Sequence, residues 1–352
     1  MPSSAVRTFT DPDDYAASMR RATAVLTVTE HGDFNAKLSR IDLHRLWMQR
    51  FFDNLPRIID IADAVRGRAY IFLRTRPGPT LVQAGVELHM SAILRHGQAD
   101  QSFQRSSGPA SFGTISLPIE YIASVGEITS GCALMPPRDA MSIDPPAAAI
   151  ARLQRLHAAA AQLAEDAPQI IAHPEAARGL EQALIEAIVA CLNGGVVGED
   201  RSALRHHAMI MRRFRRAVEE NPDQPLYIPE LCAAIGVSDR TLRVCCQEQL
   251  GMSPKHYLLL RRMHLARRAL RDNSPGVTTV TEIATQYGFW QFGRFAGAYK
   301  SLFGETPSAA PTPARIGQGS PITFFEFLPK VNSPTKVWLP MLEARARFAC
   351  PT

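Results

Sequence analysis

The pattern of apolar positions changes twice along the chain. Between residues 20 and 143, short stretches rich in Val, Ile, Leu, Phe and Tyr are separated by Gly and Pro. These stretches lie at 24–28, 34–43, 70–75, 86–94 and 112–118. Short apolar runs, some of them alternating, between turn residues predict β-strands. Strands at this spacing are typical of a small barrel or sandwich, so we expect a β-rich domain over 20–143.

From residue 147 the apolar positions recur three or four residues apart, which predicts amphipathic helices over 147–166 and 173–192. This helical connector, 147–193, would either pack on the β-rich domain or form a dimer interface, and the pattern leaves both open. The segment NGGVVGED at 193–200 predicts a linker. Its GGxxG does not follow a strand and lacks GK[ST], which argues against a phosphate loop.

The third pattern of apolar positions is a helical one that occurs twice, at 231–254 and again at 283–307. The matched pairs are Leu231 and Ile283, Gly236 and Gly288, Leu242 and Phe295, Cys246 and Tyr299, and Gly251 and Gly304. Each copy predicts a short helix, a glycine turn and a longer helix whose core positions are four apart. This is the pattern of a helix-turn-helix, whose second helix enters the major groove of DNA.

Helix-start signals and the segments beside the copies agree with this prediction. Thr279 to Glu282 fits a capping box, and Ser238 fits the N-cap after the first turn. The segment 205–221 predicts the first helix of the domain. The segment 253–272 predicts one long amphipathic helix of roughly 27 Å at ~1.5 Å per residue. Since one turn of B-DNA is about 34 Å, such a helix would place two recognition helices in successive major-groove segments.

The distribution of charge along the chain bears on the expected binding partner more than the length of the chain does. The 352 residues carry a net charge of +6, and residues 200–307 hold 16 Lys and Arg against 10 Asp and Glu, so the whole excess lies there. A localised positive charge is the electrostatic sign of a polyanion such as DNA. The 46% apolar and 20% charged fractions exclude a disordered or collagenous chain.

Other signals are absent from the sequence. No apolar run approaches the roughly 18 residues of a membrane span, and no signal peptide precedes residue 20, so we expect a cytoplasmic protein without a membrane partner. The six cysteines form no CxxC pair, which favours reduced thiols over a metal or redox site. His89 and His96 lack an HxH partner, and neither HExxH nor GxSxG occurs. We therefore expect no metal, no cofactor and no catalysis.

Residues 205–310 resemble the DNA-binding domain of the AraC/XylS family of bacterial transcription regulators. The resemblance rests on PELCAAIGVSDRTLR, RMHLARRAL and EIATQYGFWQFGRFAGAYKSLFGETP. It implies seven helices, a linker helix, and promoter DNA and RNA polymerase as partners. Residues 20–143 are more loosely similar to the cupin-like sensing domains that often precede this domain. The fold class is then α+β multidomain, with a β-rich part, a helical connector and an all-α DNA-binding domain at 200–307.

Carried over by position, Arg240, Thr241 and Arg243 look like the base-contacting set of the first unit. An Arg fork suits guanine because it donates to O6 and N7 together. Ser238 caps this helix and could meet the backbone, and Gln247 lies one turn beyond Arg243, near a base or a phosphate.

In the second unit Gln291 and Arg294 occupy the corresponding base-contacting positions. The family commonly has Ser and Arg where this chain has Gly293 and Gly297, so we expect this helix to position on phosphates more than to read bases. The residues assigned to the DNA backbone, or left uncertain, are Arg262, Trp290, Phe292 and Lys300.

The sequence thus predicts a transcription regulator, an activator of the AraC/XylS type, that senses a small molecule of unknown identity and acts as a homodimer. Trp47, Tyr70 and Phe72 either line an effector pocket or are ordinary core aromatics. Two alternatives remain: a DNA-binding module without an effector, and a cupin-type metal enzyme fused to a DNA-binding domain. The tail, 308–352, lies outside the family pattern and belongs to neither domain.

Overall fold

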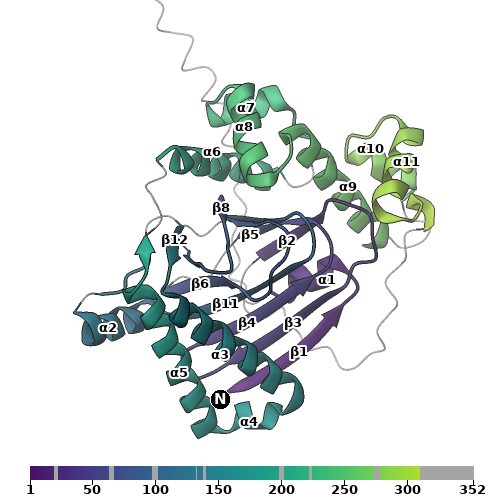
Figure 1. Cartoon of the computed structure of the whole chain (residues 1–352). Coiled ribbons are helices and arrows are strands. Elements are labelled where there is room, and N and C mark those ends of the chain that lie inside the picture. Colours follow the sequence, from purple (N-terminus) through teal and green to yellow (C-terminus); the bar gives the residue numbers. More distant parts are fainter. Residues whose placement is uncertain are drawn as a thin grey trace, which may run out of the picture. The chain divides into compact units, whose positions relative to one another are not determined.

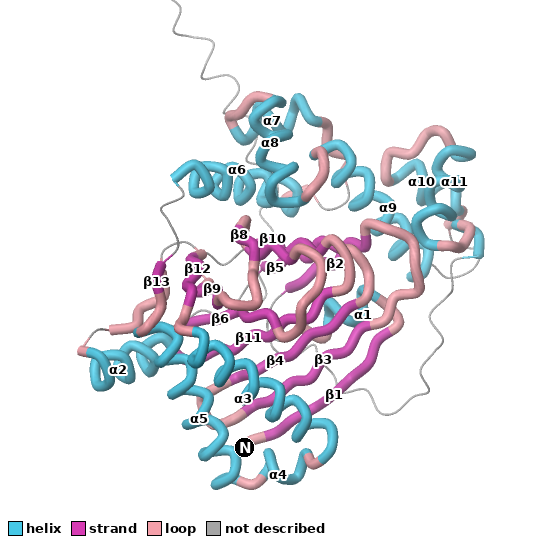
Figure 2. Tube along the Cα trace, in the orientation of Figure 1, coloured by secondary structure: helices cyan, strands magenta, loops and turns pink. Residues whose placement is uncertain are grey.

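The computed structural model describes residues 1–19, 23–62, 67–96, 102–131, 133–137, 140–197, 202–221, 224–272 and 278–309. Its N-terminal part contains two antiparallel sheets, drawn as magenta strands in Figure 2. The larger sheet has the order β1 (Ser3–Phe9), β3 (Ala36–Asp42), β4 (Trp47–Asp53), β11 (Ala110–Pro118), β6 (Arg68–Arg74), β9 (Ile93–Arg95), β12 (Met141–Asp144) and β13 (Val196–Val197). The smaller has the order β2 (Thr23–Val28), β5 (Arg57–Ala62), β10 (Ser102–Ser106), β7 (Leu81–Gln83) and β8 (Val86–Glu87).

The predicted strands 24–28 and 112–118 coincide with β2 and β11. Strand β11 pairs with β4 on one side and β6 on the other, and its residues are buried up to Pro118, which explains its continuous apolar run. The expected single strand over 86–94 is instead two short strands, β8 and β9, because His89 to Ala92 form a turn. Strands β1 and β4 escaped prediction since Arg7 and Arg50 interrupt their apolar patterns.

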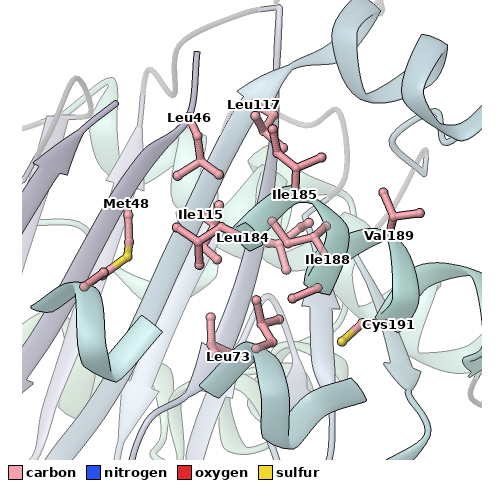
Figure 3. Close-up of a cluster of buried hydrophobic side chains, with 14 of the residues drawn as sticks. Leu46, Met48, Leu73, Ile115, Leu117, Leu184, Ile185, Ile188, Val189 and Cys191 are labelled. Atoms are coloured by element: carbon pink, nitrogen blue, oxygen red, sulfur yellow. The ribbon is translucent and has the colours of Figure 1, made fainter. Parts of the chain in front are cut away.

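Helices cover one face of the larger sheet (Figure 1). They are α2 (Ile119–Ser130), α3 (Ala147–Asp166), α4 (Pro168–Ala172) and α5 (Pro174–Asn193), and α3 and α5 match their predicted ranges. In Figure 3, Leu184 and Ile188 of α5 lie against Leu73 and Ile115 of the sheet. Of the two arrangements left open for this connector, the structure has its apolar stripes packed on the sheet.

In the C-terminal part, every regular element among the described residues from 202 onward is a helix. Its helices are α6 (Ser202–Glu219), α7 (Ile228–Ile235), α8 (Asp239–Leu250), α9 (Pro254–Asp272), α10 (Val280–Gln286), α11 (Phe292–Phe303) and the 3₁₀ helix η1 (Pro307–Ala309). Helix α9 supplies Tyr257 and Leu258 to a core with α6, α7 and α8, and Met263 and Ala266 to a second core with α10 and α11. The α+β architecture expected from the sequence is confirmed; the cupin-like character of the β-rich part stays a prediction.

Several sequence predictions fall partly or wholly outside the described residues. Of the linker 193–200, Val196 and Val197 form β13 on the edge of the larger sheet, and 198–201 are not described. Of the tail 308–352, only the first two residues are described. Among the helices that can be described, none is long and apolar enough to cross a membrane.

Candidate nucleic-acid interface

The first helix-turn-helix consists of α7 and α8. Helix α7 ends at Gly236, whose φ of +73° is a left-handed conformation that favours glycine. The N-cap of α8 is Ser238, whose Oγ accepts a hydrogen bond from the backbone N–H of Thr241 at 3.1 Å. The cap predicted from the sequence is therefore confirmed, and it fixes the point at which α8 leaves the turn.

The exposed face of α8 carries the polar residues predicted to contact bases. Arg240 and Arg243 are exposed, and Thr241 is half-buried with its Oγ1 2.8 Å from the Ser238 Oγ. The Arg243 guanidinium pairs with the Asp239 carboxylate one turn earlier, with Nη2 2.7 Å from Oδ2. Gln247 is exposed, and its Nε2 donates to the carbonyl of Gly251 at 3.2 Å. These side chains lie on one helix face, and Asp239 orients one of the two arginines.

The second helix-turn-helix consists of α10 and α11. Its capping box is present: the N–H of Glu282 donates to Thr279 Oγ1 at 3.1 Å, and the N–H of Thr279 donates to the Glu282 carboxylate at 2.6 Å. These hydrogen bonds hold the pKa of Glu282 below its usual value. Phe295 and Tyr299 are buried in the core of this unit, as their spacing predicts. The internal repeat is thus a repeat of structure.

The exposed side chains at the N-terminal end of α11 differ from those at the N-terminal end of α8. Gln291 is the N-cap residue but makes no side-chain cap bond, and Arg294 is exposed. Trp290 and Phe292 are also exposed, at 78% and 43%, while Phe289 beside them is buried. The side chains whose position the sequence left ambiguous therefore lie on the surface.

Two further predicted residues lie at different depths. Lys300 is exposed on α11. Arg262 of α9 is half-buried, with its guanidinium carbon 5.2 Å from the ring centroid of Phe289. Burial lowers the pKa of Arg262 from its ordinary value. The geometry thus assigns this guanidinium a packing contact inside the second unit.

Sequence reasoning missed the contacts between these helices and the β-rich part. Arg215 of α6 forms an ion pair with Asp60 of β5, and both are buried. Arg268 of α9 donates to the Asp13 carboxylate at 2.7 Å, just after the start of α1 (Pro12–Ala17). Phe103 of β10 packs edge-on against Tyr257 of α9. The partners are far apart in sequence, so no local pattern could have revealed them.

The interior of the β-rich part contains a buried ion pair that the sequence did not single out either. Asp53 and Arg57 are fully buried, with Oδ2 and Nη2 3.1 Å apart. The guanidinium lies 5.7 Å from the Phe112 ring centroid, and burial raises the pKa of Asp53 while Arg57 opposes the shift. Of the aromatic residues considered for a pocket, Phe72 is buried in the same core and Trp47 lies under the Arg68 guanidinium.

No metal or thiol chemistry stands out in the described residues. Within the ranges that the structure describes, no three His, Cys, Asp or Glu side chains are placed to share a metal ion. His89 is exposed. Cys191, Cys245 and Cys246 are buried as free thiols, and burial raises the pKa of Cys245 to about 11, which disfavours the reactive thiolate.

Comparison with known proteins agrees with this geometry. Residues 231–310 match a family model described as a helix-turn-helix domain. This chain is 43% identical over 91 residues to the probable thc operon regulatory protein of Rhodococcus erythropolis. It is 38% identical over 96 residues to the XylDLEGF operon transcriptional activator of Pseudomonas putida. The C-terminal part of this chain is an AraC/XylS-type helix-turn-helix domain.

The sequence match to these two relatives spans only part of each chain. It covers 26% and 27% of this chain and 27% and 30% of the two relatives. Among solved structures, the AraC-like transcriptional activator CuxR covers 75% of this chain and 95% of its own, with 13% identity and a TM-score of 0.40. A probable AraC family regulator from Rhodopseudomonas palustris covers 29% of this chain and 93% of its own, with 34% identity and a TM-score of 0.27.

Proposed function

We propose that this chain is a bacterial transcription regulator whose two helix-turn-helix units occupy successive major-groove segments of a promoter. The observation that carries the proposal is the shared helix α9, which contributes side chains to the cores of both units. Its 19 residues span roughly 28 Å at ~1.5 Å each. That span is near the pitch of B-DNA, about 34 Å, so α9 sets a separation suited to one face of the duplex.

The first unit is proposed to read bases. Arg240 and Arg243 are exposed near the start of α8, the end of a recognition helix that meets base edges. Asp239 holds the Arg243 guanidinium in one orientation before DNA arrives. A guanidinium that is already oriented loses less side-chain entropy than a free one when it donates hydrogen bonds to guanine O6 and N7. Thr241 and Gln247 complete this face.

The test is electrophoretic mobility shift and footprinting on the DNA upstream of the regulator's own gene, with Arg240→Ala and Arg243→Ala. Each substitution should relax base preference at one or two positions, by about 1–3 kcal/mol of discrimination. Arg216→Ala is the charge-matched control, since Arg216 is an exposed arginine of α6 paired with Glu220. Equal loss on all sequences would assign the arginines to phosphates, and no binding to any duplex would refute the proposal.

Effector sensing by the β-rich part is also a proposal. It is supported by the direct contacts of that part with α6 and α9, because a ligand that alters the β-rich part would alter the surroundings of these helices. A thermal-shift screen followed by mobility shifts with each hit tests it. A regulator without an effector would bind its operator with the same affinity in the absence and in the presence of every compound. Stoichiometric metal on the purified protein would favour the fused-enzyme alternative.

The remaining assignments follow from regulation of a bacterial promoter. We propose a cytoplasmic, non-enzymatic protein that activates transcription through RNA polymerase and binds DNA as a homodimer. Light scattering with and without operator DNA measures the stoichiometry. Transcription with purified RNA polymerase measures the sign of regulation.

A further inference from the structure

The second recognition helix lacks both arginines of the first at the matched positions, while Arg294 and Lys300 stand where the first has Thr241 and Gln247. With Leu242 matched to Phe295 and Cys246 to Tyr299, Arg240 corresponds to Gly293 and Arg243 to Ala296. The exposed Val244 of α8 corresponds to the exposed Gly297. At Gly293, Ala296 and Gly297, α11 therefore presents only backbone and one methyl group. At the matched positions, α8 presents the guanidinium groups of Arg240 and Arg243.

These glycines are not explained by the packing of the protein. A Cβ atom added at Gly293 or Gly297 would meet no heavy atom within 4 Å, and neither glycine has a left-handed backbone. Glycine within a helix is less favourable than alanine, since it loses more conformational freedom on folding. Two glycines at i and i+4 on an exposed face oppose local propensity, and such positions are where functional constraint is expected.

Two aromatic side chains flank this bare surface. Trp290 is 78% exposed and Phe292 is 43% exposed at the start of α11. The core of the unit is filled without them, by Phe289, Phe295 and Tyr299. The exposed start of the second recognition helix thus combines two aromatic side chains and Gly293 with one cation, Arg294.

We propose that α11 recognises the 5-methyl groups of thymine, an inference that rests on the proposed binding to promoter DNA. The thymine methyl is the apolar group that base pairs display in the major groove. Gly293 and Gly297 would let the helix backbone approach the base edges closely, and Trp290 and Phe292 would remove the methyl groups from water. The two units then use different chemistry: the first reads guanine by hydrogen bonds, and the second reads thymine by apolar contact.

Charge on the same helix favours DNA over a protein partner as the occupant of this surface. Arg294 and Lys300 are exposed on α11, and its described side chains include no carboxylate. Cations beside an apolar face suit phosphates beside methyl groups. The face is also the structural equivalent of the α8 face in the repeat, so the helix that would enter the groove presents it.

The experiment replaces thymine by deoxyuridine, which removes the methyl group and keeps the pairing. The full chain is first used to select its binding site from a random duplex library, and footprints of the Arg240→Ala and Trp290→Ala variants assign the two half-sites. Deoxyuridine is then placed in one half-site at a time. In the α11 half-site we expect affinity to fall about fourfold per contacted methyl, from ~0.8 kcal/mol for a buried carbon group, and in the α8 half-site we expect little change.

Variants connect this effect to the side chains. Trp290→Ala should weaken binding to the thymine duplex and abolish most of the difference between thymine and deoxyuridine. Ile128→Ala, which removes an exposed apolar side chain of α2, is the control and should leave both unchanged. Since Trp290 is exposed, thermal unfolding should be unaffected, which separates this result from misfolding.

The outcomes separate the two proposals. Selective binding that is indifferent to deoxyuridine in the α11 half-site overturns the methyl proposal and leaves DNA recognition standing. If no sequence is selected, the proposed function itself fails. If Trp290→Ala leaves DNA binding intact but lowers transcription with purified RNA polymerase, the aromatic face binds protein and the methyl proposal is wrong.

Discussion

The Nε2 atom of His264, in the middle of α9, lies 3.0 Å from the carbonyl oxygen of Val28, at the end of β2. Because a carbonyl only accepts, the imidazole donates from Nε2. His264 is buried and packs edge-on against Phe303. Burial, with further contributions from Arg268 and Arg267, lowers its pKa to about 3. One uncharged histidine therefore joins the helix shared by both DNA-binding units to the β-rich part.

This contact makes stability sensitive to mild acid. The pKa of His264 falls from 6.5 to about 3 on folding, so its contribution is complete above pH 6.5 and is lost as the pH falls from 6.5 toward 3. At pH 5 the loss is about 2 kcal/mol, from 1.36 kcal/mol per pH unit. The variant His264→Gln keeps a hydrogen-bond donor but does not titrate. Between pH 7.5 and pH 5, we expect its free energy of unfolding to fall by about 2 kcal/mol less than that of the native chain.

Urea denaturation at both pH values measures this difference. Comparing variant with native cancels the other titrating groups, including His157, whose pKa burial also lowers to about 3. It also cancels Asp60, whose contribution runs the opposite way because burial raises its pKa to about 7. An equal loss in both proteins would contradict the prediction.

The buried pair of Asp60 and Arg215 should behave as a coupled unit. Arg215→Leu leaves the Asp60 carboxylate buried without its main partner, so we expect a loss of about 3–5 kcal/mol in unfolding free energy at pH 8. The double variant Asp60→Leu, Arg215→Leu should be clearly more stable than Arg215→Leu alone, because no uncompensated charge remains. A double-mutant cycle by urea denaturation checks this. Additive losses would show that the pair is not coupled.

Arg243→Lys separates charge from geometry at the first recognition helix. Lysine keeps the positive charge but lacks the planar fork that Asp239 orients, so base discrimination should fall by about 1–3 kcal/mol while the salt dependence of binding stays the same. Competition with single-base operator variants at several salt concentrations measures both. Unchanged discrimination in Arg243→Lys, at an unchanged salt slope, would place Arg243 on a phosphate, where lysine serves as well.

Glycine substitutions should have opposite effects in the two units. Gly236→Ala places a side chain in a left-handed conformation and should destabilise by about 1–2 kcal/mol, although the site is spacious. Gly293→Ala, in the ordinary helical backbone of α11, should stabilise by about 0.5–1 kcal/mol. Thermal unfolding measures both. If Gly293→Ala instead destabilised the protein, the site would have a packing role that the structure does not display.

Local patterns predicted the helical domain well because its signals are short-range. The capping box of Thr279 and Glu282, the N-cap at Ser238 and the left-handed Gly236 each depend on residues within a few positions. The core spacing of Phe295 and Tyr299 is likewise local. The strands were predicted less completely, since β1 pairs with β3 and β4 pairs with β11, and the residues of β1 and β4 do not specify these distant partners.

The sequence by itself determined the two helix-turn-helix units, the basic region that carries them and the polar set on α8, because periodicity, caps and charge are written in neighbouring residues. Only the tertiary structure decided that Trp290 and Phe292 lie outside while Phe289 lies inside, that Arg262 packs on an aromatic ring, and that His264 meets Val28. Such outcomes depend on which surfaces bury one another, and burial is decided by residues that come together only when the chain has folded.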